Sequence, residues 1–160
     1  MKNVKKFDII EIMEHFETKG TFKGAFRYGS GHINDTFLLI TTTEIKDYKY
    51  ILQRINNNLF SDVEKLMHNI SLVTNYCRKS IIKMGGNPSK EVMNIINGRD
   101  GNPYYFDGEN YFRMFKYIDN SFSYDEVRDA KDFYNAAVSF GKFDNLLNGF
   151  DASLLYDILP

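Results

Sequence analysis

The stretch Gly29-Ser30-Gly31-His32-Ile33-Asn34-Asp35-Thr36-Phe37 decides how this chain is expected to fold, because it places two glycines between two β-prone runs. Glycine accepts positive φ angles and has no Cβ, so a glycine turn lets backbone N–H groups approach an anion closely. The commoner reason for glycines in a hairpin is the tight turn itself. The stretch alone therefore predicts a β-hairpin with strands over 22–28 and 33–43, and leaves open whether its tip binds a ligand.

A strand and a helix are predicted directly after this hairpin. The run Tyr48–Ile55 is rich in β-branched and aromatic residues and reads as a third strand. Ser61 and Glu64 have the spacing of a capping box, in which each side chain bonds the backbone N–H of the other residue. An apolar stripe at helical spacing follows and predicts a helix of about five turns; it comprises Val63, Leu66, Met67, Ile70, Val73, Cys77 and Ile81.

The rest of the chain completes an α+β pattern. Apolar residues at helical spacing predict a short helix within 1–20, ended by Lys19-Gly20, before the sheet. Three further strands are expected over 91–97, 104–106 and 111–118. Ser123, with Glu126 three residues later, is expected to open a long helix. We therefore expect an antiparallel sheet of five to six strands over 21–118 with one helix packed across it, and a connecting helix in 119–160.

The composition limits the classes of function. The net charge of −1 argues against a nucleic-acid binder, although residues 1–99 hold 15 Lys and Arg against 10 Asp and Glu while residues 100–160 hold 5 against 11. Cys77 is the single cysteine, so no internal disulfide is possible, and its place on the apolar helix face predicts a buried, unreactive thiol. No segment is apolar enough for a signal peptide or a membrane span, so we expect a cytoplasmic protein with no membrane partner.

Several blocks of this sequence resemble one known family. These blocks are Gly31-His32-Ile33-Asn34-Asp35-Thr36-Phe37, Ile51-Leu52-Gln53-Arg54-Ile55-Asn56, Leu66-Met67-His68-Asn69-Ile70, Tyr111-Phe112-Arg113-Met114-Phe115-Lys116-Tyr117-Ile118 and Phe140-Gly141-Lys142-Phe143. They resemble the N-acetylhexosamine 1-kinase branch of the aminoglycoside and choline phosphotransferase superfamily, from about Gly24 to the last residue. The resemblance implies the small lobe of a protein-kinase-like fold, in which a glycine hairpin, a cation-bearing strand and a helix build half of a nucleotide site.

The resemblance implies cofactor-binding residues in the hairpin and the third strand. The backbone and hydroxyl of Ser30, together with Gly31, His32 and Asn34, would cover the phosphates of a bound nucleotide. Asn34 or Asp35 could instead fix the turn through bonds to the backbone. Arg54 is the expected phosphate cation, because the resemblance implies a Lys or Arg at this position of the strand, although an exposed strand arginine is the ordinary alternative. Alternation along the strand places Gln53 on the opposite face. If the register differs by one residue, the neutral amide of Gln53 faces the nucleotide instead.

A second set of cofactor-binding residues is expected in a hinge. Phe115, Lys116, Tyr117 and Ile118 correspond to the segment whose backbone would bond the adenine edge, although packing of a central strand explains the same aromatic residues. Kinases pair the phosphate cation with a glutamate of the helix. Glu64 is already explained by the capping box, so this ion pair is expected to be absent or replaced by a contact near His68 or Asn69.

Catalytic and metal-binding residues are not expected in this chain. No histidine is followed two residues later by aspartate, and no Asp-Phe-Gly-like triplet follows the hinge. The resemblance implies the ATP-binding lobe of a kinase for the anomeric hydroxyl of an N-acetylhexosamine or another small alcohol, and the missing motifs lead us to expect the Mg²⁺ ligands outside the chain. The lobe alone would be inactive and would self-associate through an apolar face along 140–159. The alternative is a non-catalytic binding or interaction module.

Overall fold

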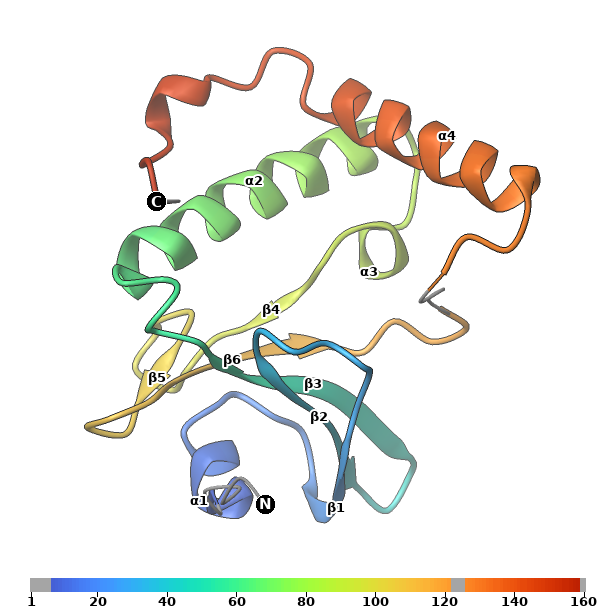
Figure 1. The fold of residues 1–160 in the computed structure, drawn as a ribbon. Helices are drawn as coiled ribbons and strands as arrows, with labels where there is room; N and C mark the ends of the chain where they lie inside the picture. The colour runs from blue at the N-terminus through green and yellow to red at the C-terminus, as the bar shows by residue number, and fades with distance from the viewer. Residues whose placement is uncertain (1–6, 122–125, 159–160) are drawn as a thin grey trace. The chain divides into compact units, whose positions relative to one another are not determined.

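The computed structural model describes residues 7–121 and 126–158 and has an α+β fold with an open, antiparallel six-stranded sheet and four α-helices (Figure 1). The elements are α1 (Ile9–Glu14), β1 (Thr21–Arg27), β2 (Asp35–Thr42), β3 (Asp47–Ile55), α2 (Val63–Lys83), α3 (Pro88–Glu91), β4 (Ile95–Ile96), β5 (Tyr105–Phe106), β6 (Tyr111–Lys116), α4 (Ala130–Leu146) and the 3₁₀ helix η1 (Ala152–Leu154).

The chain divides into two compact units. Unit 1 consists of the described residues within Met1–Val63 and Ile95–Tyr117, and it holds α1 and the whole sheet. Unit 2 consists of the described residues within Glu64–Asn94 and Ile118–Pro160, and it holds α3, α4, η1 and nearly all of α2. The chain therefore crosses between the units at the start of α2, before β4 and directly after β6.

The sheet has the strand order β1-β2-β3-β6-β4, and β5 pairs with β6 outside this path (Figure 1). Every pairing is antiparallel. Asp35 lies opposite Arg54 and Thr36 opposite Gln53, while Gln53 lies opposite Arg113 on β6. This register places residues that are far apart in sequence in rows across the sheet.

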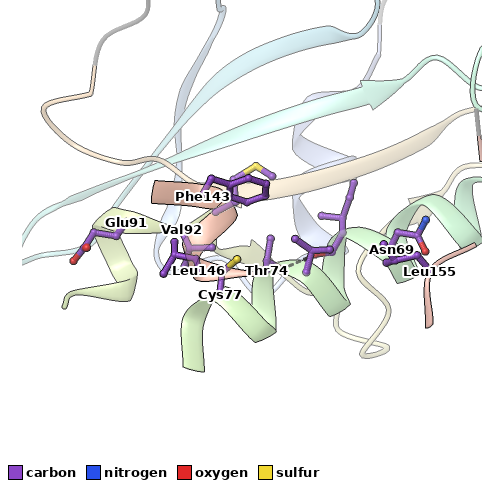
Figure 2. A pocket seen from close by; sticks show the side chains of 11 residues that line it. Asn69, Thr74, Cys77, Glu91, Val92, Phe143, Leu146 and Leu155 are labelled. Atoms are coloured by element: carbon purple, nitrogen blue, oxygen red, sulfur yellow. Dashed lines mark hydrogen bonds between the residues drawn. The ribbon is translucent and has the colours of Figure 1, made fainter. Parts of the chain in front are cut away.

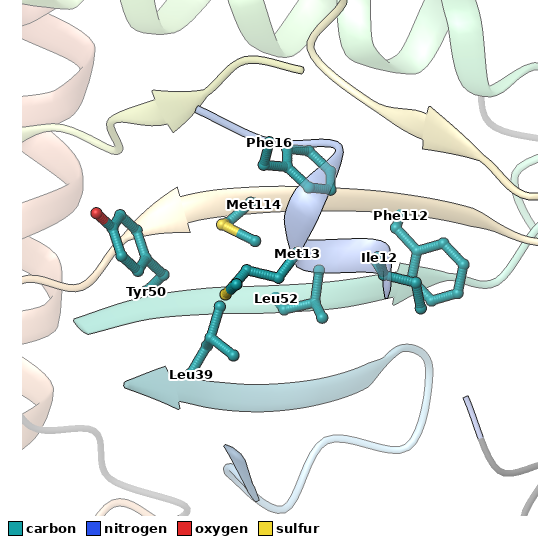
Figure 3. Close-up of a cluster of buried hydrophobic side chains, with 8 residues drawn as sticks. All are labelled: Ile12, Met13, Phe16, Leu39, Tyr50, Leu52, Phe112 and Met114. Atoms are coloured by element: carbon teal, nitrogen blue, oxygen red, sulfur yellow. The ribbon is translucent and has the colours of Figure 1, made fainter. Parts of the chain in front are cut away.

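Helix α1 covers one face of the sheet in unit 1. The Asp8 side chain caps it by accepting hydrogen bonds from the backbone N–H groups of Ile10 and Glu11, both at 3.1 Å. Ile12 and Met13 from the helix, with Phe16 just after it, pack in one cluster of buried side chains with the sheet (Figure 3). The sheet contributes Leu39, Tyr50, Leu52, Phe112 and Met114 to this cluster.

Unit 2 is held together by side chains of α2 that bond distant backbone. The Asn69 amide donates to the Tyr156 carbonyl at 2.8 Å and accepts from the Tyr156 N–H at 3.0 Å. The Tyr76 hydroxyl donates to the Asn148 carbonyl at 2.7 Å. These bonds attach the segment after α4 to α2.

The structure corrects two predicted elements. The strand expected over 91–97 is reduced to β4, because Asn87 caps a one-turn helix that has Pro88 at its start. The long helix begins at Ala130, since the Asp129 side chain accepts from the Asp132 N–H at 2.8 Å. Val127 is therefore outside this helix, and the expected cap Ser123 lies outside the described residues.

Two local signals do not act as predicted. Helix α2 begins at Val63, so Ser61 stands two positions before the helix and not at the N-cap position that the predicted capping box requires. Helix α1 already ends at Glu14, so Gly20 does not end it. Gly20 instead has a φ of +80° and lies so close to Thr42 that an added Cβ would be 2.4 Å from the Thr42 carbonyl oxygen.

Candidate functional site

The loop between β1 and β2 contains two glycines with different structural requirements. Gly29 has a φ of +75°, a backbone conformation that favours glycine. Gly31 is not among the residues with positive φ, and a Cβ added to it would meet no atom within 4 Å. The turn therefore explains Gly29, whereas the fold of the described residues gives no reason for the missing side chain of Gly31.

The polar residues of this loop divide between exposed positions and a structural bond. Ser30, Gly31 and His32 are exposed. The Asn34 side-chain oxygen accepts a hydrogen bond from the backbone N–H of Asn56 at 2.9 Å, which ties the start of β2 to the end of β3. Asn34 thus fixes the base of the loop, one of the two roles that its sequence position suggested.

Arg54, the expected phosphate cation, belongs to an ion cluster centred on Asp35. Arg54 donates from Nε and Nη2 to Oδ2 of Asp35, at 2.7 and 2.6 Å, and Arg27 donates to Oδ1 at 2.7 Å. Burial raises the pKa of Asp35, but the bonds and charges of the two arginines outweigh it and lower the pKa overall. The Arg54 guanidinium also lies 5.7 Å from the Phe7 ring.

Gln53 belongs to a polar row on the opposite face of the sheet. Its amide nitrogen donates to the Thr36 hydroxyl at 3.0 Å, and its amide oxygen accepts from Nε of Arg113 at 3.0 Å. The row Thr36–Gln53–Arg113 thus crosses β2, β3 and β6. Burial lowers the pKa of Arg113 to about 10, so this cation is held in partly desolvated surroundings.

The expected hinge lies where β6 ends and the chain passes from unit 1 to unit 2. Phe115 is buried and Lys116 is exposed, while the Tyr117 N–H donates to the Lys49 carbonyl at 3.0 Å. Ile118 is the first residue of unit 2 after β6. The backbone N–H of Tyr117 is therefore part of the extended pairing between β6 and β3.

The structure brings the start of the glycine loop into contact with Tyr117 of the expected hinge. The rings of Tyr28, at the start of the loop, and Tyr117 meet edge-on with centroids 6.0 Å apart. The hydrogen bond to Tyr117, with burial, raises the pKa of Tyr28. The Lys49 ammonium lies 5.5 Å from the Tyr117 ring. By alternation Lys49 and Tyr117 share the sheet face that carries Gln53 and Arg113.

The helix residues that were considered as partners of the cation have neighbours inside unit 2. Asn69 makes the two bonds to Tyr156 described above, and the His68 ring packs against the Tyr156 ring with centroids 5.0 Å apart. Glu64 lies in the first turn of α2, where a negative charge stabilises the helix. Local structure thus accounts for all three residues.

Unit 2 contains an apolar pocket of about 380 Å³ (Figure 2). Its walls are formed by Asn69, Ile70, Val73, Thr74, Cys77, Glu91, Val92, Met93, Phe143, Leu146 and Leu155. The Thr74 hydroxyl donates to the Ile70 carbonyl at 2.7 Å, so it already has a partner. Cys77 is buried, as its helix position predicted, and burial raises its pKa, which keeps the thiol protonated and weakly nucleophilic.

A polar cavity of about 580 Å³ lies in unit 1 beside the loop after β4. The His15 and Tyr105 rings stack there with centroids 3.8 Å apart. Asp100 accepts two hydrogen bonds from Asn102, and Nε of Arg99 donates to the Glu14 carbonyl at 2.7 Å. The charged groups of this cavity therefore stabilise the loop itself.

A scan against models of known protein families finds no match for this chain. Within the described part of the chain, no three or more histidine, cysteine, aspartate or glutamate side chains are grouped to hold a metal ion. Among the helices of residues 7–121 and 126–158, none has the length and apolar character needed to cross a membrane.

Arg113 and Thr36 were not predicted as site residues from the sequence. Arg113 was read as part of an aromatic run, although alternation alone places it on one face with Phe115. Its place beside Gln53 depends on the pairing of β3 with β6, which residue spacing does not reveal.

Proposed function

We propose that unit 1 binds a nucleotide and is the small lobe of an ATP-dependent small-molecule kinase. The connectivity supports this, since a glycine loop joins β1 to β2, β3 follows, and α2 lies in the connection from β3 to β4. The next central strand, β6, pairs with β3 and leads directly to the segment proposed as the hinge. This order of elements supports the proposal, because a kinase-like nucleotide site is built from a glycine loop, a third strand, a helix and a hinge strand in the same order.

The observation that carries the proposal is the contact between Tyr28 of the glycine loop and Tyr117 of the hinge. It means that the loop reaches the sheet face on which Gln53 and Arg113 lie. A loop with backbone donors above a sheet face with a cation is an arrangement that suits a phosphate chain bound near the hinge.

The substrate and metal belong to the same proposal. The acceptor would be the anomeric hydroxyl of an N-acetylhexosamine, or a similar small alcohol, as the resemblance implies. Mg²⁺ would neutralise the triphosphate when bound; among the described residues, no three or more His, Cys, Asp or Glu side chains are grouped to hold it.

A second candidate is a non-catalytic interaction module. The ion cluster around Asp35 favours it, because this carboxylate engages Arg27 and Arg54 together. A cation that already has a carboxylate partner in the sheet binds phosphate less readily, since the ligand must compete with that partner.

Isothermal titration of the purified chain with ATP tests the proposal through Gly31→Ala. We expect measurable ATP binding by the wild-type chain and at least about tenfold weaker binding by the variant, because a Cβ enters the space of the phosphates. The stability of the variant should be unchanged, since the added Cβ meets no atom in the free protein.

Gly141→Ala is the matched control. Gly141 lies on α4, and a Cβ there also meets nothing within 4 Å, so ATP binding should not change. The proposal is rejected in favour of the interaction module if the wild-type chain does not bind ATP at millimolar concentration. Equal ATP binding by Gly31→Ala and Gly141→Ala would also reject it.

A further inference from the structure

We propose that Arg113, positioned by Gln53, is the cation of this lobe that binds the nucleotide phosphates, in place of Arg54. This inference rests on the proposed function, and it specifies which side of the sheet and which side chain carry the positive charge.

Arg54 and Arg113 lie on opposite faces of the sheet. Arg54 shares its face with Leu52 and Phe112, and this is the face on which α1 packs. Gln53 and Arg113 lie on the opposite face. The Tyr28–Tyr117 contact places the start of the glycine loop over that opposite face. A phosphate held by the loop would therefore approach Arg113 and not Arg54.

Arg54 already has an anionic partner, Asp35. Two of its nitrogens bind the same oxygen of Asp35 at 2.6 and 2.7 Å, and its side chain is only 24% exposed. A phosphate would have to approach a carboxylate that lies within hydrogen-bond distance of this guanidinium. Because like charges repel strongly at that range, binding there is unfavourable.

Contacts with Gln53 and Phe115 orient the Arg113 guanidinium. Its Nε donates to the Gln53 oxygen at 3.0 Å, and its guanidinium lies 5.3 Å from the centre of the buried Phe115 ring. These contacts fix the plane of the group before a ligand arrives. A planar guanidinium with a fixed orientation is well suited to recognise phosphate oxygens.

Arg113 lies in partly desolvated surroundings, which lower its pKa to about 10. The same low polarity strengthens the attraction between the guanidinium and a phosphate relative to water.

The polar row Thr36–Gln53–Arg113 also connects the Arg113 cation to the glycine loop. Thr36 lies two positions after Asn34 and begins the row that continues through Gln53 to Arg113. Neighbouring strands are about 4.8 Å apart, so the row extends about 10 Å across the sheet from the base of the loop. A phosphate chain that follows this row would meet a hydroxyl, an amide and then the cation.

The test compares Arg113→Met with the matched variant Arg54→Met, using ATP and adenosine as the probes in isothermal titration. Arg113→Met should weaken ATP binding at least about tenfold and leave adenosine binding within about twofold, because only the phosphates meet the cation. Arg54→Met should keep ATP binding within about threefold of the wild-type value. Circular dichroism spectra establish that both variants are folded.

Gln53→Met serves as a second variant, which removes the hydrogen bond that positions Arg113 but keeps the charge of Arg113. It should weaken ATP binding by at least about threefold with adenosine unaffected. Loss of ATP binding in Arg54→Met with retention in Arg113→Met or Gln53→Met overturns this inference and restores Arg54 as the phosphate cation. A wild-type chain that binds neither ATP nor adenosine instead refutes the proposed function itself, so the two failures are distinguishable.

Discussion

Gly20→Ala is expected to be among the most destabilising single substitutions in the sheet, and its cost follows from the geometry around this residue. Gly20 has a φ of +80°, which is unfavourable for alanine by roughly 1–2 kcal/mol. The new Cβ would also lie 2.4 Å from the Thr42 carbonyl oxygen and 2.7 Å from its carbonyl carbon. Real Cβ atoms do not come this close to backbone, so the chain must move.

The surroundings of Gly20 resist such a movement. The neighbouring Lys19 donates its N–H to the Tyr50 hydroxyl at 2.9 Å, and its carbonyl accepts from the Thr41 hydroxyl at 2.5 Å. Thr42 is paired with Thr21 at the start of β1. Forcing extra volume into such a site costs about 1–3 kcal/mol, so the total loss should be about 2–5 kcal/mol.

Urea unfolding followed by circular dichroism measures this loss, with two matched glycine variants as references. Gly29→Ala has the same kind of φ, +75°, but no atom within 4 Å of the new Cβ, so it should lose only about 1–2 kcal/mol. Gly31→Ala has neither problem and should stay within about 0.5 kcal/mol of the wild type. If Gly20→Ala loses no more stability than Gly29→Ala, the close contact with Thr42 does not add to the cost of the substitution.

Three further outcomes are expected. Asp35→Asn should cost about 1–2 kcal/mol of unfolding free energy at pH 7, given that Asp35 is 23% exposed. Because the folded pKa of Asp35 is lowered, its contribution to stability is present above the unfolded pKa of about 3.9 and is lost as the pH falls through the folded pKa. The difference in stability between wild type and Asp35→Asn, measured by urea unfolding, should therefore be smaller at pH 2.5 than at pH 7. Leu52→Ala should cost about 2–5 kcal/mol in the same assay because Leu52 is 1% exposed, whereas Ile45→Ala at a 90% exposed position should change stability by less than about 0.5 kcal/mol. Phe133 and Phe140 on α4 are 68% and 72% exposed, so light scattering should detect self-association that Phe140→Ser reduces, and an entirely monomeric wild-type chain at about 1 mM would contradict this.

The local elements of this fold can be predicted from the amino-acid sequence. The glycine loop, the third strand, the long helix α2 and the aromatic strand β6 were predicted within a few residues of their bounds, because each depends on the spacing of apolar residues along a short segment. The errors occurred where two local signals compete. Asn87-Pro88 starts a helical turn where a strand was expected, and Asp129 caps a helix whose start was expected at Ser123.

The contacts between these side chains depend on how the strands and α1 pack, which the sequence did not reveal. Alternation along β3 shows that Gln53 and Arg54 point to opposite faces, but it does not show which face α1 covers. The packing of α1 shows that Arg54 lies on the face opposite to the one where Tyr28 meets Tyr117, and the ion pair with Asp35 gives Arg54 a partner there. The pairing of β3 with β6 brings Arg113 beside Gln53. Strand pairing joins segments that are distant in the chain, so residue spacing within one segment carries no record of it.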